Sequence, residues 1–464
     1  MSTGLHASRV EDRHFPGLGP VFSHARSFAS PGGNVRWVAA AGRAALIWFP
    51  VYGLLADRLS PFAAAATTSL IAGVWLLALR AALSTYFTLG PAVASAVGTL
   101  TGLVAVSALN LWVPGISLDA RTLAQTAAVI FALSAVWEHF VRSIAKRRVL
   151  VVGTGGSASA VIDELEDDER TPFRVVGVVD DEGRAEGLLD LPRLGSLADL
   201  SPIVEAQRPD IVILADDRTS AWVFDQLLRL APLGFKVVTV SHFFEHAFGR
   251  VPLEHLTPAW FMSMLHLRQK PYTRVAKRAF DLVVAAVGLL LIAPLLPLLV
   301  VLVRATPGPI VYRQTRLGEG GRHFTMYKFR TMRDRAEESG RPVFAQEHDP
   351  RVTRLGRLLR WTHLDEVPQL WNVLKGEMSI VGPRPERPEF VELLEERVPF
   401  WPRRLLVKPG ITGWAQLRCG YAYDPRSTAD KLSYDLWYLR NRNVVVDLAI
   451  CAKTASSLLF RPGR

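Results

Sequence analysis

Four long apolar runs in the first third of the chain constrain its fold more than any other feature. They are rich in Ala, Leu, Val and Trp and lie at 37–56, 61–79, 91–113 and 122–141. Each is close to the ~20 residues that a helix needs to cross a bilayer. A soluble four-helix bundle is the alternative, but helices of that kind keep a polar face, which these runs lack. The sequence therefore predicts a membrane protein with a four-helix transmembrane bundle over 36–142.

Charged residues indicate the orientation of these helices. Most charges stand at the joints between the runs, with Arg43 inside the first run as the exception. A basic cluster follows the fourth run: Arg142, Lys146, Arg147 and Arg148. Because cytoplasmic ends of membrane helices carry an excess of Lys and Arg, we expect this end in the cytosol. Four spans put the N-terminus there too. Residues 1–35 are polar and lack a signal-peptide apolar core, so they are expected to form a disordered cytosolic tail.

The overall charge narrows the choice of partners. Hydrophobic residues make up 49% of the chain, and the net charge is +11. A basic membrane protein is expected to contact anionic headgroups or phosphorylated substrates. Nucleic acid is the rival partner, but the sequence has no zinc-ligand spacing, basic heptad region or RNA-binding signature, so no nucleic-acid binding is expected. Cys419 and Cys451 are the only cysteines, which suits a reducing cytosolic face.

Residues 143–262 change character and alternate strands with helical stretches. Strands are expected at the start of 149–158, at 175–179 before Asp180-Asp181, at 211–214 and at 236–240. This alternation predicts an open parallel sheet, a Rossmann-like α/β domain.

A glycine turn follows the first of these strands. Gly153, Gly155 and Gly156 match G-x-G-x-x-A and are the candidate cofactor-binding residues. This fingerprint alone is weak, and the Tyr-x-x-x-Lys pair of short-chain proton relays is absent from the sequence. A regulatory or dimerising scaffold is therefore favoured over nucleotide binding, and a homo-oligomer is one expected arrangement.

A fifth apolar run, 282–303, is broken by Pro294 and Pro297. Cations flank both of its ends, so the positive-inside bias gives no direction for a crossing. Proline removes a helical hydrogen bond and kinks a helix, and a kinked helix can enter one leaflet and return. The sequence predicts a re-entrant membrane helix over 279–304, with a fifth spanning helix as the alternative.

Two adjacent carboxylates, Asp365 and Glu366, precede a short amphipathic helix with apolar residues at i, i+3, i+4 and i+7. Pro368 fits the first turn of a helix, and Gly376 is a plausible stop. We expect the helix to begin close to Asp365, where its N-terminus would keep the carboxylate ionised and favour a phosphate nearby. The alternative is a helix cap followed by a solvated acid. Arg384, held between two prolines, adds a side chain that matches phosphate oxygens bidentately.

Several ordered blocks in the C-terminal part resemble those of a known family. They are Lys277-Arg278-x-x-Asp281, Tyr327-Lys328-Phe329-Arg330-Thr331-Met332, Leu364-Asp365-Glu366-x-Pro368-Gln369-Leu370-x-Asn372-Val373-Leu374-Lys375-Gly376, Gly382-Pro383-Arg384-Pro385 and Pro409-Gly410-Ile411-Thr412-Gly413-Trp414. On these residues, roughly 270–464 resembles the bacterial sugar transferases, the monotopic polyprenyl-phosphate phosphoglycosyl transferases. The four runs and the α/β stretch resemble the front end of the large members, the undecaprenyl-phosphate glucose- or galactose-phosphate transferases.

The resemblance implies a reaction on the cytosolic face of the bacterial inner membrane. A UDP-sugar and Mg²⁺ would bind at Asp365 and Glu366, and Asp365 would attack the sugar-linked phosphate, expel UMP and form an aspartyl phosphosugar. Polyprenyl (undecaprenyl) phosphate would then take the sugar phosphate and start an exopolysaccharide or O-antigen repeat. Glu366 would share the metal or manage protons. The implied substrate phosphate-binding cations are Lys328, Arg360 and Arg384, with Arg330 as a further candidate.

The resemblance also gives the predicted transferase domain, 263–464, an α/β monotopic fold. The sequence departs from the family pattern at Ala293-Pro294, where many members have Ser-Pro. It also departs over 417–423, a stretch that varies among members, so the sequence does not identify the sugar. Two other functions compete: a membrane NAD-dependent nucleotide-sugar dehydratase or epimerase, and a non-enzymatic scaffold for polysaccharide assembly. The first would require the missing Tyr-x-x-x-Lys pair, and the second would not depend on Asp365.

Overall fold

A computed structural model describes residues 35–57, 59–85, 87–112, 118–153, 156–167, 171–181, 192–215, 221–256, 260–261, 271–333, 349–419 and 425–460. The predicted tail, apart from its last residue, and Gly155 lie outside these residues. The chain divides into two compact units. One comprises 1–76 and 128–240, and the other comprises 77–127 and 241–464.

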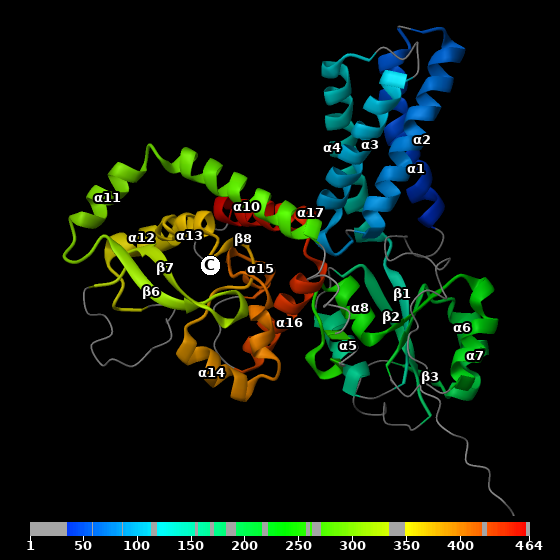
Figure 1. Cartoon of the computed structure of the whole chain (residues 1–464). Coiled ribbons are helices and arrows are strands. Elements are labelled where there is room, and N and C mark those ends of the chain that lie inside the picture. The colour runs from blue at the N-terminus through cyan, green and yellow to red at the C-terminus, as the bar shows by residue number, and fades with distance from the viewer. Residues whose placement is uncertain are drawn as a thin grey trace, which may run out of the picture. The chain divides into compact units, whose positions relative to one another are not determined.

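Four helices of the described chain are long and apolar enough to cross a membrane, as predicted. They are α1 (Val35–Leu55), α2 (Pro61–Thr85), α3 (Pro91–Trp112) and α4 (Ala120–Ile144) (Figure 1). Many of their large apolar side chains are exposed, among them Phe49 and Leu77, which suits contact with lipid.

Arg43, the charge inside the first apolar run, is paired within the first unit. Its Nε atom donates to Oε1 of Glu138 on α4 over 2.6 Å, and the Glu138 side chain is only 4% exposed. Trp137 Nε1 donates to the carbonyl oxygen of Ala39, 3.1 Å away. A charge in an apolar segment requires such a partner, so α1 packs against the second half of α4.

The first unit also contains a five-stranded parallel sheet, which confirms the predicted parallel α/β domain. Its order is β3-β2-β1-β4-β5, formed by β1 (Arg147–Val152), β2 (Phe173–Val179), β3 (Arg193–Gly195), β4 (Ile211–Leu214) and β5 (Lys236–Thr239). The predicted strands correspond to β1, β2, β4 and β5, and β3 was not predicted.

Helices cover both faces of this sheet. The buried side chains of α6 (Leu200–Gln207) and α7 (Ala221–Arg229) share one apolar cluster with Leu150 and Val152 of β1. The alternate residues Val149 and Val151 are also buried and point to the other face, as the period of a strand requires. Figure 1 shows α5 (Gly156–Asp167) on the side opposite α6 and α7.

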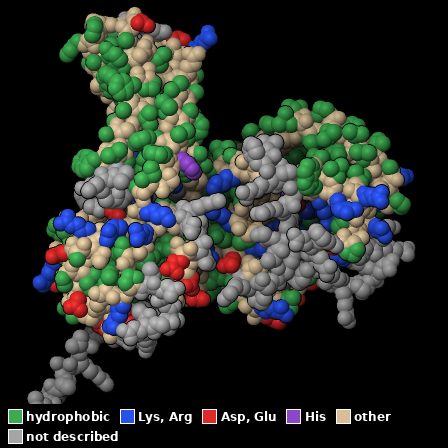
Figure 2. Space-filling view, turned by 180° about the vertical axis from the view of Figure 1, so that it is seen from behind, with side chains coloured by type: hydrophobic (Ala, Val, Ile, Leu, Met, Phe, Trp, Pro, Cys, Tyr) green, Lys and Arg blue, Asp and Glu red, His purple; other side chains and the backbone are tan. Residues whose placement is uncertain are grey.

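In the second unit, α10 (Pro271–Ile292) and α11 (Leu296–Arg304) meet at a bend of 69°. The predicted break at Pro294 is therefore present, although α10 begins earlier than the predicted helix. The pair is exposed and apolar along its outer side, with Leu290 and Leu291 more than 70% exposed. Figure 2 shows hydrophobic side chains gathered over this part of the chain.

The rest of the second unit after α11 is α/β, with two small sheets. An antiparallel pair joins β6 (Val311–Leu317) to β7 (His323–Phe329), and a parallel pair joins β8 (Ser379–Val381) to β9 (Gly410–Thr412). The α-helices described in this part are α12 (Arg354–Trp361), α13 (Gln369–Lys375), α14 (Pro388–Arg397), α15 (Trp414–Arg418), α16 (Pro425–Asn441) and α17 (Val444–Phe460). α8 (Val240–Ala247) precedes the bent pair in the chain.

One large apolar core holds this region together, with Trp401, Trp414 and Tyr438 almost completely buried. A second cluster joins Leu299 and Val303 of α11 to Phe329 of β7 and Leu359 of α12. The bent helix pair is therefore packed directly against the elements that carry the candidate site.

Candidate active site

Asp365 and Glu366 lie in a single 3₁₀ turn, Leu364–Glu366, and both side chains are buried. His363 precedes the turn with φ of 56°, a left-handed conformation that reverses the chain after α12. The predicted helix start at Asp365 is therefore wrong: α13 begins only at Gln369, after Pro368. The predicted stop is correct, because Gly376 ends α13 with φ of 88°.

Glu366 holds two cations that come from different elements. Nζ of Lys328 on β7 lies 2.7 Å from Glu366 Oε1, and Nη2 of Arg384 lies 3.2 Å from the same oxygen. Burial alone would raise the pKa of Glu366, but these two cations outweigh it and hold the pKa at about 2. Glu366 is thus ionised at any physiological pH.

Asp365 has a different environment, although it is the next residue. Within the described residues no Lys or Arg forms an ion pair with its carboxylate. Burial raises its pKa, while the charges of Lys328, Arg360 and Arg384 act in the opposite direction. The ionising effect expected from a helix N-terminus is therefore not found: the three nearby cations offset burial only in part, and the pKa of Asp365 stays above its ordinary value. Asp365 is therefore a buried carboxylate that has cations nearby but forms no ion pair with a described Lys or Arg.

The two remaining predicted cations are placed differently. Arg360 belongs to α12, and its Nε atom donates to Thr331 Oγ1 over 2.9 Å, which leaves its charge close enough to lower the pKa of Asp365. Arg330 instead donates to the carbonyl oxygens of Val303, Thr306 and Pro307 at the end of α11. The structure does not bring Arg330 to the acidic pair, and these contacts support a role in holding α11.

Asn372, on the buried side of α13, was not singled out as a site residue. It is 0% exposed, and its Oδ1 accepts the main-chain N–H of Tyr327 over 3.1 Å. Its Nδ2 donates to the carbonyl oxygen of Thr325 and to Glu377 Oε2. Asn372 therefore fixes α13 to β7, which helps to maintain the 2.7 Å contact between Lys328 and Glu366. Its place in the Leu364–Gly376 block, as a polar residue within a short helix, was the sequence signal for it.

Arg278 on α10 supports the same helix from its other end. Its two terminal nitrogens donate to the carbonyl oxygens of Val373 and Leu374 over 2.6 and 2.7 Å. These carbonyls belong to the last turn of α13, where helical carbonyl oxygens lack their usual i+4 donors, and Val373 O also accepts the N–H of Gly376 over 3.0 Å. Arg278 was noted in the sequence only as part of a block, because nothing in its spacing indicates a contact 95 residues away.

Lys277 and Asp281 connect α10 to β8. Lys277 Nζ lies 2.7 Å from Asp447 and 3.2 Å from Asp281, and Asp281 accepts from Ser379 Oγ and from the N–H of Ile380. The strand that leads to Arg384 is thus fixed to α10 by buried polar contacts.

The glycine turn lies in the other unit. Gly153 follows β1 with φ of 96°, and its N–H donates to the carbonyl oxygen of Val179 over 2.8 Å. Gly156 begins α5, and Asp180, at the end of β2, is buried. The strand before the glycine turn and the helix start after it are therefore present, while Gly155 lies outside the described residues.

The donors for a metal ion are few. No group of three or more His, Cys, Asp or Glu side chains that could hold a metal occurs among the described residues. The acidic pair supplies only carboxylate oxygens, which are the hard ligands that Mg²⁺ prefers.

Comparison with known proteins points to one family. A family model described as bacterial sugar transferase matches residues 272–461. Among curated relatives, the chain is 38% identical over 275 residues to an Aeromonas hydrophila protein named UDP-N-acetylgalactosamine-undecaprenyl-phosphate N-acetylgalactosaminephosphotransferase. It is 32% identical to the undecaprenyl-phosphate glucose phosphotransferase of Komagataeibacter xylinus and 31% identical to the undecaprenyl-phosphate galactose phosphotransferase of Salmonella typhimurium.

These similarities extend over much of each chain. They cover 59%, 68% and 68% of this chain, in the same order, and 62%, 59% and 69% of the relatives. The chain thus spans about three fifths of the first two relatives, and the three names specify three different sugars.

Proposed function

Because the chain belongs to the bacterial sugar transferase family, we propose that it transfers a hexose-1-phosphate from a UDP-sugar to polyprenyl (undecaprenyl) phosphate. The products would be a polyprenyl-diphosphate sugar and UMP. One observation supports this proposal in addition to the family match. Glu366 forms ion pairs with Lys328 and Arg384, and the adjacent buried Asp365 forms no ion pair with any described residue. A nucleophile and its electrostatic support are thereby separated on neighbouring residues.

In the first proposed step, a carboxylate oxygen of Asp365 attacks the sugar-linked phosphorus of the donor. A bond from that oxygen to phosphorus forms, the bond to the UMP oxygen breaks, and UMP leaves with the electron pair. An aspartyl phosphosugar remains. Dividing one displacement into two through a covalent carboxylate intermediate is ordinary nucleophilic catalysis. Lys328, Arg360 and Arg384 would neutralise the charge that develops on the phosphate oxygens.

In the second step, an oxygen of polyprenyl phosphate attacks the same phosphorus and restores the Asp365 carboxylate. The attacking oxygen is already ionised, so no proton has to be removed from it. Glu366, whose pKa of about 2 keeps it charged, would not donate a proton at neutral pH. We therefore assign Glu366 to the organisation of the cations and of a metal rather than to acid catalysis.

We also propose that Asp365 and Glu366 hold Mg²⁺ together with the phosphates of the donor. Mg²⁺ is usually bound by one or two carboxylates plus substrate phosphates and water, which suits a site with only two acidic side chains. The ion would offset the negative charge of the diphosphate when bound.

The lipid substrate sets where this site must lie. The phosphate of polyprenyl phosphate stays at the headgroup level, so Asp365 has to lie close to the inner leaflet. We propose that α10 and α11 form a re-entrant helix pair, because their bend of 69° and exposed apolar side chains suit entry into one leaflet. The catalytic domain would then face the cytosol of the inner membrane, where UDP-sugars are found, and start an exopolysaccharide or O-antigen repeat.

The remaining parts are assigned from their patterns. We propose the domain division 36–142, 143–262 and 263–464 after a tail of 1–35. The strand order β3-β2-β1-β4-β5 supports a Rossmann type for the α/β domain, with Gly153, Gly155 and Gly156 at the turn where a nucleotide would bind. For the α/β domain as a whole, we favour a role as a regulatory or dimerising scaffold over nucleotide binding. The family match favours the transferase over a dehydratase or a non-enzymatic scaffold.

Release of UMP tests this function. The purified chain in detergent, given Mg²⁺, polyprenyl phosphate and a panel of UDP-glucose, UDP-galactose and their N-acetylated forms, should release UMP from at least one donor. Asp365→Asn should abolish the release because an amide is not an effective nucleophile. UMP release at an unchanged rate by Asp365→Asn would refute the assignment of Asp365.

A further inference from the structure

The segment Pro383-Arg384-Pro385 has an unusual hydrogen-bonding problem. Proline has no main-chain N–H, so two of its three residues offer no donor with which to fix the segment. The segment must therefore be held through its carbonyl oxygens. Gly410 N–H donates to Pro383 O over 2.8 Å, and Arg316 Nη1 donates to Pro385 O over 2.9 Å.

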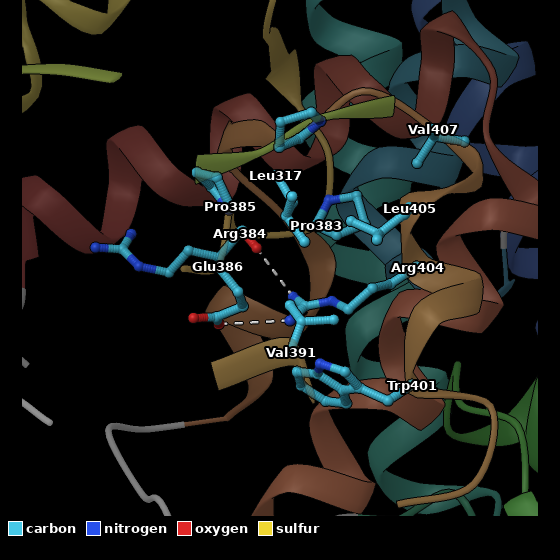
Figure 3. Close-up of a pocket in the computed structure, with 11 residues that line it drawn as sticks. Leu317, Pro383, Arg384, Pro385, Glu386, Val391, Trp401, Arg404, Leu405 and Val407 are labelled. Atoms are coloured by element: carbon cyan, nitrogen blue, oxygen red, sulfur yellow. Dashed lines mark hydrogen bonds and ion pairs between the residues drawn. The ribbon is translucent and has the colours of Figure 1, made fainter. Parts of the chain in front are cut away.

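Arg404 holds the central carbonyl. Its Nη2 atom donates to the carbonyl oxygen of Arg384 over 3.1 Å, and its Nη1 atom lies 3.4 Å from Glu386 Oε1. Figure 3 shows both interactions, with the Arg384 side chain pointing away from Arg404. Arg404 thus contacts the main chain of Arg384 from behind, while the Arg384 guanidinium reaches Glu366 on the other side.

Arg404 is itself rigidly placed. Its side chain is 5% exposed, its guanidinium carbon lies 4.3 Å from the centre of the Trp401 ring, and its Nη2 atom lies 2.9 Å from Asp435 Oδ2 on α16. The Asp435 side chain is 2% exposed. Burying two charges is costly, and such a pair is weak support for stability alone. A packed apolar pair could not donate a hydrogen bond to the Arg384 carbonyl, so holding this segment explains why a charged pair is buried here.

We propose that Arg404, oriented by Asp435, is a positioning residue for Arg384. Arg404 does not touch the acidic pair. It fixes the main chain from which Arg384 extends, and so fixes the distance between the Arg384 guanidinium and Glu366. The Arg384 side chain is 40% exposed and long, so without a fixed base its charge would spread over many positions. This proposal rests on the proposed phosphate-binding role of Arg384.

A double-mutant cycle separates this role from general stabilisation. We would measure kcat/KM for the UDP-sugar in Arg404→Gln, Arg384→Gln and the double variant, with Arg403→Gln as the matched control. Arg403 is the neighbouring residue and is exposed. Arg404→Gln should lower kcat/KM about tenfold or more, since small misplacements of a positioning group are costly. In the Arg384→Gln background the same change should lower it by less than about twofold, because coupled residues are non-additive. Arg403→Gln should have no effect.

Two further variants keep the test decisive if Arg404→Gln does not fold. Asp435→Asn keeps the shape of the side chain and removes its charge, and it should show the same loss and the same dependence on Arg384. Arg404→Lys should recover only part of the activity, because lysine cannot bind two acceptors with a planar fork. Equal losses of kcat/KM in the presence and absence of Arg384 would overturn the proposal.

The failure of this proposal differs from that of the proposed function. Lack of UMP release by the unmodified chain would count against the function alone. The same variants would then be compared by calorimetric binding of UDP. Arg404→Gln should weaken UDP binding when Arg384 is present and leave it unchanged when Arg384 is replaced. An equal effect in both backgrounds would again contradict the positioning role.

Discussion

Lys328 Nζ lies 2.7 Å from Glu366 Oε1, and this contact gives the two adjacent acids different environments. With Glu366 neutralising Lys328 and Arg384, the neighbouring Asp365 keeps an unengaged carboxylate inside a positive environment. Two adjacent acids therefore have opposite pKa shifts. The predictions below follow from this division and from the contacts that maintain it.

Lys328→Gln should leave Glu366 buried with only one cation and remove a charge from the phosphate site. We expect kcat/KM for the UDP-sugar to fall by roughly a hundredfold, which is the order expected for loss of one preorganised electrostatic group. UMP release at several donor concentrations measures it. Lys375→Gln is the control, since Lys375 is exposed and its side chain contacts Tyr327 rather than either acid. Similar losses in both variants would show that the effect is not local.

The acidic side of the pH–rate profile should report the pair. Burial raises the pKa of Asp365 above its ordinary 3.8, so kcat/KM should fall on acidification with an apparent pKa higher than 3.8. Because the Lys328 charge lowers the pKa of Asp365, Lys328→Gln should move this fall to still higher pH. A fall at or below pH 3.8, or one that Lys328→Gln moves toward lower pH, would contradict the arrangement.

The stability of the protein should also fall on acidification, in this case because Glu366 becomes protonated. Its pKa is lowered from 4.5 to about 2, so its ion pairs contribute stability that is complete above pH 4.5 and is lost as the pH falls toward 2. Glu366→Gln should therefore flatten the loss of stability between these values. Thermal unfolding in detergent at a series of pH values measures it, and an unchanged slope would argue against a strongly paired Glu366.

Arg278→Met should loosen α13. It removes two hydrogen bonds to the last carbonyls of that helix, and hydrogen bonds from a charged group contribute about 1.5–3 kcal/mol each. We expect a lower Tm together with reduced kcat/KM, because Asn372 of α13 fixes this helix to β7, the strand that carries Lys328. Arg274→Met, on the same helix, is the comparison variant. A normal Tm in Arg278→Met would show that α13 does not need this cap.

The membrane helices offer a test that does not involve the site. Glu138→Gln should leave the Arg43 charge without its partner in an apolar segment and reduce stability by about 1–3 kcal/mol. Replacing both residues, as Arg43→Gln with Glu138→Gln, should recover much of that loss. Thermal unfolding of the unmodified chain, Glu138→Gln and the double variant checks it, and a double variant no more stable than Glu138→Gln would contradict direct pairing.

Features that depend on local pattern could be predicted from the sequence. The four apolar helices, the parallel strands and the break near Pro294 follow from run length, alternation and proline, and Gly376 ends α13 as its backbone freedom suggests. The acidic turn could not be predicted, because Asp365 is held by a 3₁₀ turn whose shape depends on the left-handed His363.

Contacts between residues far apart in the sequence could not be predicted either. From their sequence block, Lys328 was predicted to bind phosphate and Arg330 was only a further candidate. In the structure Lys328 reaches Glu366, and Arg330 reaches carbonyl oxygens at the end of α11. Adjacent positions on a strand point to opposite faces, but residues two apart need not find the same neighbours once the strand ends. Arg278 and Arg404 were overlooked for the same reason, since their partners are determined by the fold.

The most direct measurement is a trapping experiment on Asp365. The purified chain would be incubated with Mg²⁺ and a UDP-sugar labelled in the sugar, without polyprenyl phosphate, then quenched, digested and mapped by mass spectrometry. The account predicts a phosphosugar ester on Asp365 that disappears when polyprenyl phosphate is added, and no adduct in Asp365→Asn. Turnover to polyprenyl-diphosphate sugar with no adduct on Asp365, or an adduct on another residue, would contradict it.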